Sequence, residues 1–259
     1  MSSEILSERR GATQLLTLSD PATRNAMSPQ AYSAGIEAVG QAEADAEVRC
    51  IVLRGHGAHF CAGGNVQRLA GVRRGDPVEQ ALAMERFHGF IEALRACPKP
   101  VIAAVEGFAA GGGAAIALAC DLIIAAEGAR FVLSYGKIGL SPDGGASWHL
   151  ARLLPRSLAL QMLWLPEPMT ARDWQAQRLV HSVTDDGQAL DAALALAERL
   201  ARMAPNALAS AKALVNAAPE RPLREQLDAE REHFIVNLFH ANGGEGLQAF
   251  LDKREPRFG

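Results

Sequence analysis

The chain has 259 residues, of which 49% are hydrophobic and 21% are charged, and its formal net charge is −3. This length and composition predict one large soluble domain with a sizeable core, with or without a small appendage. The slightly acidic balance does not favour binding to nucleic acid or to an anionic membrane surface. No apolar run reaches the ~18 residues that span a bilayer. We therefore expect neither a nucleic-acid partner nor a membrane partner.

The N-terminal segment, residues 1–18, has no uninterrupted apolar core of the kind found in signal peptides. The cysteines, Cys50, Cys61, Cys97 and Cys120, are scattered without metal-ligand spacing. We interpret them as reduced thiols of a cytoplasmic protein. The histidines also lack ligand spacing, so we expect no metal site.

Strands and helices are expected to alternate in the first half of the chain. Short apolar runs predict strands at residues 13–18, 50–53, 101–105, 122–125 and 131–133. Helices are predicted from residue 29 to about 46, from 77 to about 96, and over 114–119. Ser28 and Asp76 each precede a proline and are typical of helix N-caps. Such alternation favours an α/β fold with a mainly parallel sheet.

From residue 147 onward nearly every segment is predicted to be helical. The expected helices lie near 147–154, 157–164, 170–177, 188–203 and 205–217. A long helix should follow from Pro222 to about Ala241, with a last one after Gly243. Proline, glycine or asparagine separates these segments.

One stretch, residues 101–131, reads as strand, glycine turn, helix and strand. Gly111, Gly112 and Gly113 have no Cβ atom, so their backbone N–H groups can approach a ligand closely. The helix that starts there adds unpaired N–H groups and the positive end of its dipole. This pattern favours a site for an anion, or for an oxygen that becomes one during a reaction.

A second glycine loop, Ala62, Gly63 and Gly64, follows another predicted strand. Ligands of open α/β sheets bind at the carboxyl ends of the strands, where two loops can each direct one N–H group at a single oxygen. The alternative interpretation is that both loops are tight turns without a ligand. Neither loop matches a phosphate-binding motif.

Asp143 lies in a Pro-Asp-Gly-Gly loop after a predicted apolar strand. It is either a turn aspartate that bonds its own backbone or a general base whose pKa is raised by apolar surroundings. Glu106, just before the glycine triplet, is expected at the surface or at a strand end. A Ser-His-Asp triad is not expected, because the chain has no G-x-S-x-G elbow.

Several short motifs occur together in an order that is highly specific. They lie at residues 24–27, 60–65, 99–103, 106–107, 111–113, 120–122, 245–246, 249–251 and 253–254. In these residues the chain resembles the crotonase superfamily, the enoyl-CoA hydratases and isomerases, over almost its whole length. The resemblance implies a crotonase-like spiral of βαβ units over residues 1–200, which contains the active site. It also implies a C-terminal helical trimerisation region over 201–259, and a homotrimer or a hexamer of two trimers.

The resemblance further implies that the ligand is an acyl-CoA thioester, which is the substrate, so no separate cofactor is expected. Members of this family form an oxyanion hole from two backbone N–H groups, which correspond to Gly64 and Gly112 here. An enolate formed next to a thioester needs such donors already in place. Ala62 is expected in the same substrate site, and Arg24 is a candidate to meet phosphate groups.

The sequence departs from the hydratases of the family at both positions where they have a catalytic glutamate. These positions are Ala115 and Tyr135 here, and neither side chain offers a carboxylate that accepts hydrogen bonds from water. Asp143 resembles instead the acid of family isomerases, which include Δ3,Δ2-enoyl-CoA isomerases and the ring-type isomerase of phenylacetyl-CoA degradation. We expect Asp143 to move a proton between two carbons of the acyl chain while Gly64 and Gly112 hold the dienolate oxygen.

Phe87, Tyr135 and Trp148 are candidates for the pocket wall, with core packing as the alternative for each. Phe250 and Lys253 are candidates to reach the CoA of a neighbouring subunit, as equivalent residues do in related trimers. The single loop carboxylate favours a double-bond isomerase of acyl-CoA or fatty acid metabolism. Two other functions stay open. One is an enoyl-CoA hydratase or other crotonase-type lyase, and the other is an acyl-CoA-binding subunit without catalysis.

Overall fold

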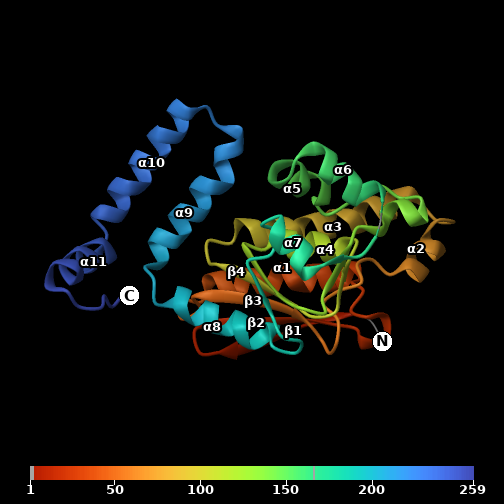
Figure 1. The fold of residues 1–259 in the computed structure, drawn as a ribbon, viewed down its shortest axis with the longest axis horizontal. Helices are drawn as coiled ribbons and strands as arrows, with labels where there is room; N and C mark the ends of the chain where they lie inside the picture. The colour runs from red at the N-terminus through yellow and green to blue at the C-terminus, as the bar shows by residue number, and fades with distance from the viewer. Residues whose placement is uncertain (1–2, 166) are drawn as a thin grey trace.

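The computed structural model describes residues 3–165 and 167–259. Its centre is a six-stranded sheet with the order β1-β2-β3-β4-β6-β9 (Figure 1). The strands are β1 (Glu4–Arg10), β2 (Thr13–Ser19), β3 (Cys50–Gly55), β4 (Val101–Val105), β6 (Leu122–Ala126) and β9 (Ser182–Thr184). β1 pairs with β2 in the antiparallel sense, and the pairs from β2 through to β9 are parallel. The mainly parallel sheet expected from the sequence is confirmed.

A second, smaller sheet has the order β5-β7-β8. Its strands are β5 (Phe108–Ala110), β7 (Arg130–Val132) and β8 (Met169–Thr170). An isolated bridge between Cys61 and Ala109 joins the loop after β3 to β5. The small sheet therefore holds the two glycine loops of the sequence side by side.

Helices cover both faces of the large sheet (Figure 1). One face packs against α1 (Pro29–Ala44), α3 (Pro77–Ala96) and α4 (Gly112–Ala119), and the other packs against α8 (Ala189–Ala201). Side chains alternate accordingly, with Leu53 and Ala103 in the first core and Val52 and Ile102 in the second. Burial on both faces explains why these strands read as continuous apolar runs.

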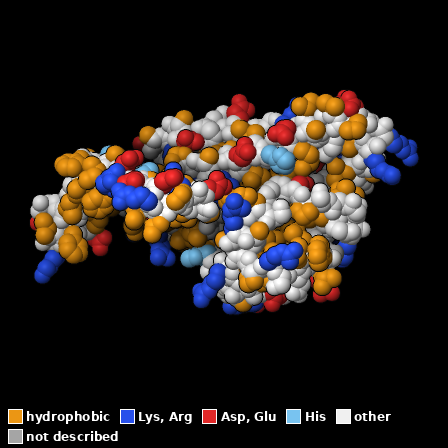
Figure 2. All heavy atoms as spheres, turned by 90° about the horizontal axis from the view of Figure 1, so that it is seen from above, with side chains coloured by type: hydrophobic (Ala, Val, Ile, Leu, Met, Phe, Trp, Pro, Cys, Tyr) orange, Lys and Arg blue, Asp and Glu red, His pale blue; other side chains and the backbone are white. Residues whose placement is uncertain are grey.

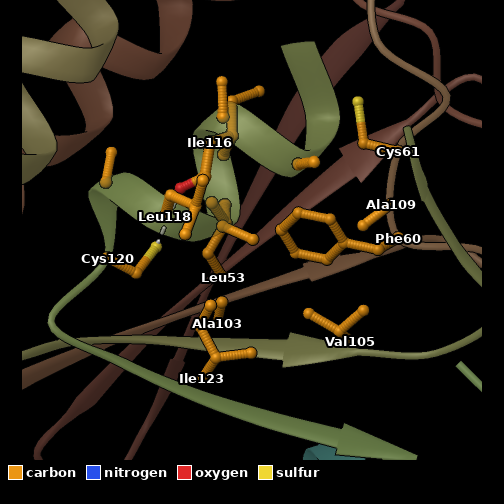
Figure 3. Packing of buried hydrophobic residues seen from close by; sticks show 14 of the residues in the cluster. Leu53, Phe60, Cys61, Ala103, Val105, Ala109, Ile116, Leu118, Cys120 and Ile123 are labelled. Atoms are coloured by element: carbon orange, nitrogen blue, oxygen red, sulfur yellow. Dashed lines mark hydrogen bonds between the residues drawn. The ribbon is translucent and has the colours of Figure 1, made fainter. Parts of the chain in front are cut away.

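The helix α4 is buried on every side, since all of its residues are buried. Its first turn lies close to the loop after β3, since a Cβ atom on Gly113 would lie 2.2 Å from the carbonyl oxygen of Cys61. Figure 3 shows the ring of Phe60 filling the space between α4 and Val105 of the sheet. Phe60, Val105 and Ile116 are all fully buried. The packing of this core fixes the position of the glycine-led N-terminus of α4.

The region from residue 147 onward is mainly helical, as predicted, but it also contains two strands that were not predicted, β8 and β9. Both are so short that pairing with β7 and β6, rather than a local pattern, defines them. The predicted helices are present as α5 (Ala146–Leu153), α6 (Arg156–Trp164), α7 (Ala171–Ala176), α8, α9 (Pro205–Ala217) and α10 (Leu223–Leu238). Further short helices are α2 (Val66–Val72), η1 (Pro21–Thr23), η2 (Ser134–Ile138) and η3 (Ala218–Glu220).

The last helix, α11 (Ala241–Asp252), begins before Gly243 rather than after it. A Cβ atom on Gly243 would lie 2.2 Å from the carbonyl oxygen of Asn237. This glycine therefore lets the start of α11 pack tightly against the end of α10, instead of separating two helices.

Helices α9, α10 and α11 form an arm that extends from the body of the molecule (Figure 1). Hydrophobic side chains gather over this arm, at the left of Figure 2. Among them Phe234 is 65% exposed, and Phe239 and Phe250 are each 82% exposed. Large exposed apolar surfaces of this kind are typical of contacts with another protein. Within the described residues, the helices are too short or too polar to cross a membrane.

Candidate active site

The two glycine loops meet beyond the carboxyl ends of β3 and β4. The N–H of Cys61 donates to the carbonyl of Phe108 at 3.0 Å, and the N–H of Ala110 donates to the carbonyl of Cys61 at 2.9 Å. A Cβ atom on Gly63 would lie 2.6 Å from the carbonyl oxygen of Ala110 and 3.0 Å from the nitrogen of Gly112. Gly63 also has φ +86°. Only glycine allows the loops to approach so closely in this conformation.

This approach places the N–H groups of Gly64 and Gly112 in neighbouring loops. Gly112 is the first residue of α4, where a backbone N–H has no acceptor inside the helix. Among residues 3–165 and 167–259, neither of these two N–H groups donates a hydrogen bond to the protein. Such groups normally find an acceptor. Each of the two neighbouring loops therefore keeps one N–H group free for a ligand.

A turn at Arg24 and Asn25 supports the loop that contains Gly64. Both turn residues have positive φ, 56° and 59°. The carbonyl of Arg24 accepts a hydrogen bond from the N–H of Ala62 at 3.0 Å. The fully buried side chain of Asn25 donates to backbone carbonyls of the following loop at 2.7 and 2.9 Å. Arg24 and Ala62 thus lie beside the candidate site and shape it through their backbones.

Asp143 lies in the loop between η2 and α5, and η2 separates this loop from the strand expected before it, β7. Its Oδ1 atom accepts a hydrogen bond from the phenol of Tyr135 at 2.7 Å. A Cβ atom on Gly112 would lie 3.8 Å from the same oxygen. The structure therefore brings Asp143, Tyr135 and Gly112 together, so that a carboxylate lies beside a loop with a free backbone N–H group.

The surroundings of Asp143 change its acidity. Burial raises its pKa above the usual range, and this effect is opposed by the hydrogen bond from Tyr135 and by the charge of His88. Burial, followed by the charge of Asp143, raises the pKa of Tyr135 well above its usual value. The phenol therefore acts as the donor and the carboxylate as the acceptor. The carboxylate is a stronger base than that of an exposed aspartate.

Apolar side chains pack under the loop that contains Asp143. A Cβ atom on Gly144, which has φ +56°, would lie 2.4 Å from the ring of Phe87 and 3.0 Å from the Cβ of Ala115. Tyr32 stacks on Phe87, with ring centroids 4.7 Å apart. A longer side chain at position 115 would displace the loop, so Ala115 and Gly144 fit each other.

The structure does not bring the other predicted residues to this group. The indole of Trp148 lies between the guanidinium groups of Arg95 and Arg152, whose Cζ atoms are 4.4 and 3.9 Å from the ring centroid. It lines a different cavity, of about 530 Å³, bounded by α3, α4, α5 and α9. Phe250 is on α11 and Lys253 caps it, at the end of the arm (Figure 1). The prediction for Phe250 and Lys253 therefore still concerns contact with the CoA of a neighbouring subunit.

Other residues singled out in the sequence have structural roles. The carboxylate of Glu106 accepts hydrogen bonds from the N–H groups of Gly187 and Ala189, at 3.2 and 3.0 Å. It thus joins the end of β4 to the start of α8, as a strand-end residue. All four cysteines are free and buried. No cluster of possible metal ligands occurs in the described part of the chain.

Tyr32, which stacks on Phe87 beneath the loop that contains Asp143, was not indicated by the sequence. It is buried in α1, and burial, then Cys61, then Asp143 raise its pKa. The one feature of the sequence that could have drawn attention to Tyr32 is the rarity of tyrosine, since the chain has only 2. The structure places both tyrosines near Asp143.

The sequence matches the family described as enoyl-CoA hydratase/isomerase over residues 8–259. It is 35% identical over 255 residues to the 1,2-epoxyphenylacetyl-CoA isomerase of Escherichia coli K12, covering 98% of this chain and 97% of that protein. It is 34% identical over 257 residues to the 2,3-dehydroadipyl-CoA hydratase of the same strain, covering 99% and 98%. The fold matches the crystal structure of an enoyl-CoA hydratase from Polaromonas sp. JS666 with TM-score 0.98 and 52% identity, covering 99% of this chain and 100% of that one. Isomerases and hydratases thus both occur among the similar proteins.

Proposed function

Within the enoyl-CoA hydratase/isomerase family, to which this chain belongs, we propose that it is an acyl-CoA isomerase that shifts a double bond. Membership of the family confirms the resemblance in its motifs, and the structural match confirms the crotonase-like fold. The observation that supports isomerase chemistry is a single carboxylate, Asp143, beside Gly112. An acyl-CoA thioester is the substrate in this proposal, and no cofactor takes part.

The proposed reaction moves one proton and one pair of electrons within the acyl chain. Asp143 accepts a proton from the carbon next to the thioester, so a C–H bond breaks and an O–H bond forms on the carboxylate. The electron pair delocalises onto the thioester oxygen, where the N–H groups of Gly64 and Gly112 stabilise the negative charge. Asp143 then returns the proton two carbons along the chain. Nothing is consumed, so one carboxylate suffices.

The same residues argue against efficient hydration. Family hydratases hold and activate water with a pair of glutamates, and the corresponding positions here are Ala115 and Tyr135. The methyl of Ala115 packs under Gly144, and the phenol of Tyr135 is bonded to Asp143. Hydratase activity is nevertheless the second candidate, because the names of several similar proteins are those of hydratases.

The test follows absorbance with 3-enoyl-CoA and 2-enoyl-CoA as separate substrates. We expect the protein to convert the 3-enoyl thioester to the conjugated 2-enoyl form. We do not expect it to add water to the 2-enoyl thioester. Asp143→Asn keeps the shape but removes the base, so it should lower kcat by at least roughly 100-fold. Binding of an acyl-CoA to this variant, measured by calorimetry, should be retained.

Two outcomes would contradict the proposal. Rapid hydration of the 2-enoyl form by the unmodified protein would favour the hydratase. Inertness toward both thioesters with intact binding would favour a non-catalytic acyl-CoA-binding subunit or a different acyl group. A ring-containing acyl-CoA is the next substrate to try, because one similar protein is named as an epoxyphenylacetyl-CoA isomerase.

We also propose that the protein works as a homotrimer, or as a hexamer of two trimers, in the cytoplasm. The exposed apolar side chains of the arm supply a surface for such assembly. Four free, buried cysteines fit a reducing compartment. In this assembly Phe250 and Lys253 would contact the CoA of a neighbouring subunit.

A further inference from the structure

We propose that Tyr135 is a positioning residue for Asp143: its phenol holds the Oδ1 oxygen of the carboxylate beside Gly112, and so fixes the orientation in which the carboxylate takes the substrate's proton. This inference rests on the proposed isomerase function. Its basis is the hydrogen bond from Tyr135 to Oδ1, at 2.7 Å, between a buried phenol and a partly buried carboxylate. A carboxylate held at one oxygen has lost its freedom to rotate, which favours a reproducible approach to a carbon acid.

The phenol itself is held firmly. Tyr135 belongs to η2 and is only 6% exposed. Its carbonyl accepts a hydrogen bond from the N–H of Leu140 at 3.0 Å, which folds the loop before Asp143 back onto η2. Its ring lies 4.0 Å from the position that a Cβ on Gly111 would occupy. Tyr135 therefore links the loop with the base to the loop with the oxyanion donors.

A neutral donor suits a base that must stay reactive. Burial raises the pKa of Asp143, and the hydrogen bond from Tyr135 partly opposes that shift. A lysine or arginine at the same place would lower the pKa much further and weaken the base. Three other side chains with charge or acidity face this group, namely His88 on α3, Tyr32 on α1, and Arg68 on α2, which acts on Tyr32.

The competing interpretation is that Tyr135 is only an aromatic wall of the acyl pocket. In that case the ring matters and the hydroxyl does not. Tyr135→Phe separates the two, because it keeps the ring and removes the O–H. Tyr32→Phe is a matched control, since it removes the chain's other phenol O–H, which makes no hydrogen bond to Asp143.

The experiment measures the pH dependence of kcat/KM for 3-enoyl-CoA isomerisation in the unmodified protein and in both variants. In Tyr135→Phe we expect kcat to fall roughly 10- to 100-fold, with KM changed less than threefold. The acidic limb of its kcat/KM profile, where activity falls as the pH is lowered, should move to higher pH. Without the hydrogen bond from the phenol, Asp143 needs a higher pH to ionise. The acidic limb of Tyr32→Phe should stay where it is.

A second substitution keeps the test decisive if Tyr135→Phe folds poorly. 3,5-Difluorotyrosine at position 135 keeps the ring and the O–H but makes the phenol a stronger donor. The acidic limb should then move to lower pH, opposite to the effect of phenylalanine.

The outcomes separate this inference from the proposed function. If Asp143→Asn is inactive while both changes at Tyr135 leave kcat and the acidic limb unaltered, Tyr135 is only a wall and the inference fails. If Asp143→Asn turns over normally, the proposed function fails and the inference fails with it.

Discussion

His149 shows how burial beside cations affects a single residue. It is 3% exposed on α5, and burial, followed by the charges of Arg95 and Arg152, lowers its pKa from 6.5 to about 4. In the unfolded chain a histidine has a pKa of about 6.5. Below that pH the unfolded state therefore binds a proton that the folded state excludes. Stability should be full above about pH 6.5 and should fall as the pH drops toward 4.

We expect this residue alone to lower the free energy of unfolding by about 2 kcal/mol between pH 6.5 and pH 5. Urea denaturation at a series of pH values measures it. His149→Gln removes the titrating group and should flatten the pH dependence in this range. An equal slope in the unmodified protein and in His149→Gln would show that His149 does not titrate as described.

The residues of the candidate site were predictable from sequence to different degrees. The two glycine loops are recognisable in the sequence because a close backbone approach needs glycine. A Cβ atom on Gly63 would lie 2.6 Å from the carbonyl oxygen of Ala110, and one on Gly113 would lie 2.2 Å from that of Cys61. The bond between Tyr135 and Asp143 is not visible, because it depends on how η2 and the next loop fold back. Trp148 was a candidate for the pocket wall, with core packing as the alternative. In the structure its ring lies against the guanidinium groups of Arg95 on α3 and Arg152 on α5.

At the scale of elements, Lys212 links the arm to the body of the molecule. From α9 its Nζ donates to Oδ2 of Asp121 at 2.8 Å, and to the carbonyls of Leu94 and Lys99, each at 3.3 Å. The same Oδ2 accepts the N–H of Val101 at 2.7 Å. The side chains of Lys212 and Asp121 are only 12% and 27% exposed. One ammonium group thus joins α9 to the end of α3 and to the start of β4.

We expect Lys212→Met to destabilise the fold by roughly 1.5–3 kcal/mol, because hydrogen bonds to charged groups contribute about that much and Asp121 loses its partner. Thermal denaturation measures the total loss, and hydrogen exchange should localise it to α9. Lys137→Met, at an exposed position of η2, should change stability by less than about 0.5 kcal/mol. Equal melting temperatures for the two variants would mean that the Lys212 contacts contribute little.

Long elements could be predicted and short ones could not, for a physical reason. The helices at residues 29–44 and 77–96 begin at Ser28 and Asp76, whose side chains accept backbone N–H groups as expected of N-caps. β5, β8 and β9 have two or three residues and exist only because a partner strand lies beside them. β1 is largely exposed and polar at the edge of the sheet, so it has no alternating pattern to detect.

At the scale of the whole molecule, a single chain does not explain why the arm exposes so much apolar surface. The helix α8 ends at Ala201 and α9 begins at Pro205, near the expected boundary between core and C-terminal region, which stays a prediction. The arm has no buried residue on α9 or α10. Because the cost of exposing so much apolar surface is large, covering it with further copies of the chain would stabilise the arm.

We expect light scattering to give three or six times the 27.5 kDa of one chain. Phe234→Asp combined with Phe239→Asp should yield monomers, because both side chains are exposed in the chain and a buried charge opposes association. Val78→Asp, which changes an apolar residue that is 61% exposed on α3, should leave the assembly intact. A double variant that keeps the native mass would exclude this face of the arm from the interface.

Assembly and substrate binding are coupled if a neighbouring subunit completes the CoA site. The monomeric double variant should then bind acyl-CoA at least about 10-fold more weakly, since it lacks Phe250 and Lys253 of the neighbour, and one lost charged contact is worth about that factor. Asp143, Tyr135 and the two glycine loops all come from one chain, so turnover at saturating substrate should fall much less. The kinetics of the monomer therefore distinguish the part of the site that binds CoA from the part that carries out the chemistry. A rise in KM with kcat preserved would assign CoA binding to the assembly and the chemistry to the single chain, whereas loss of kcat alone would contradict that division.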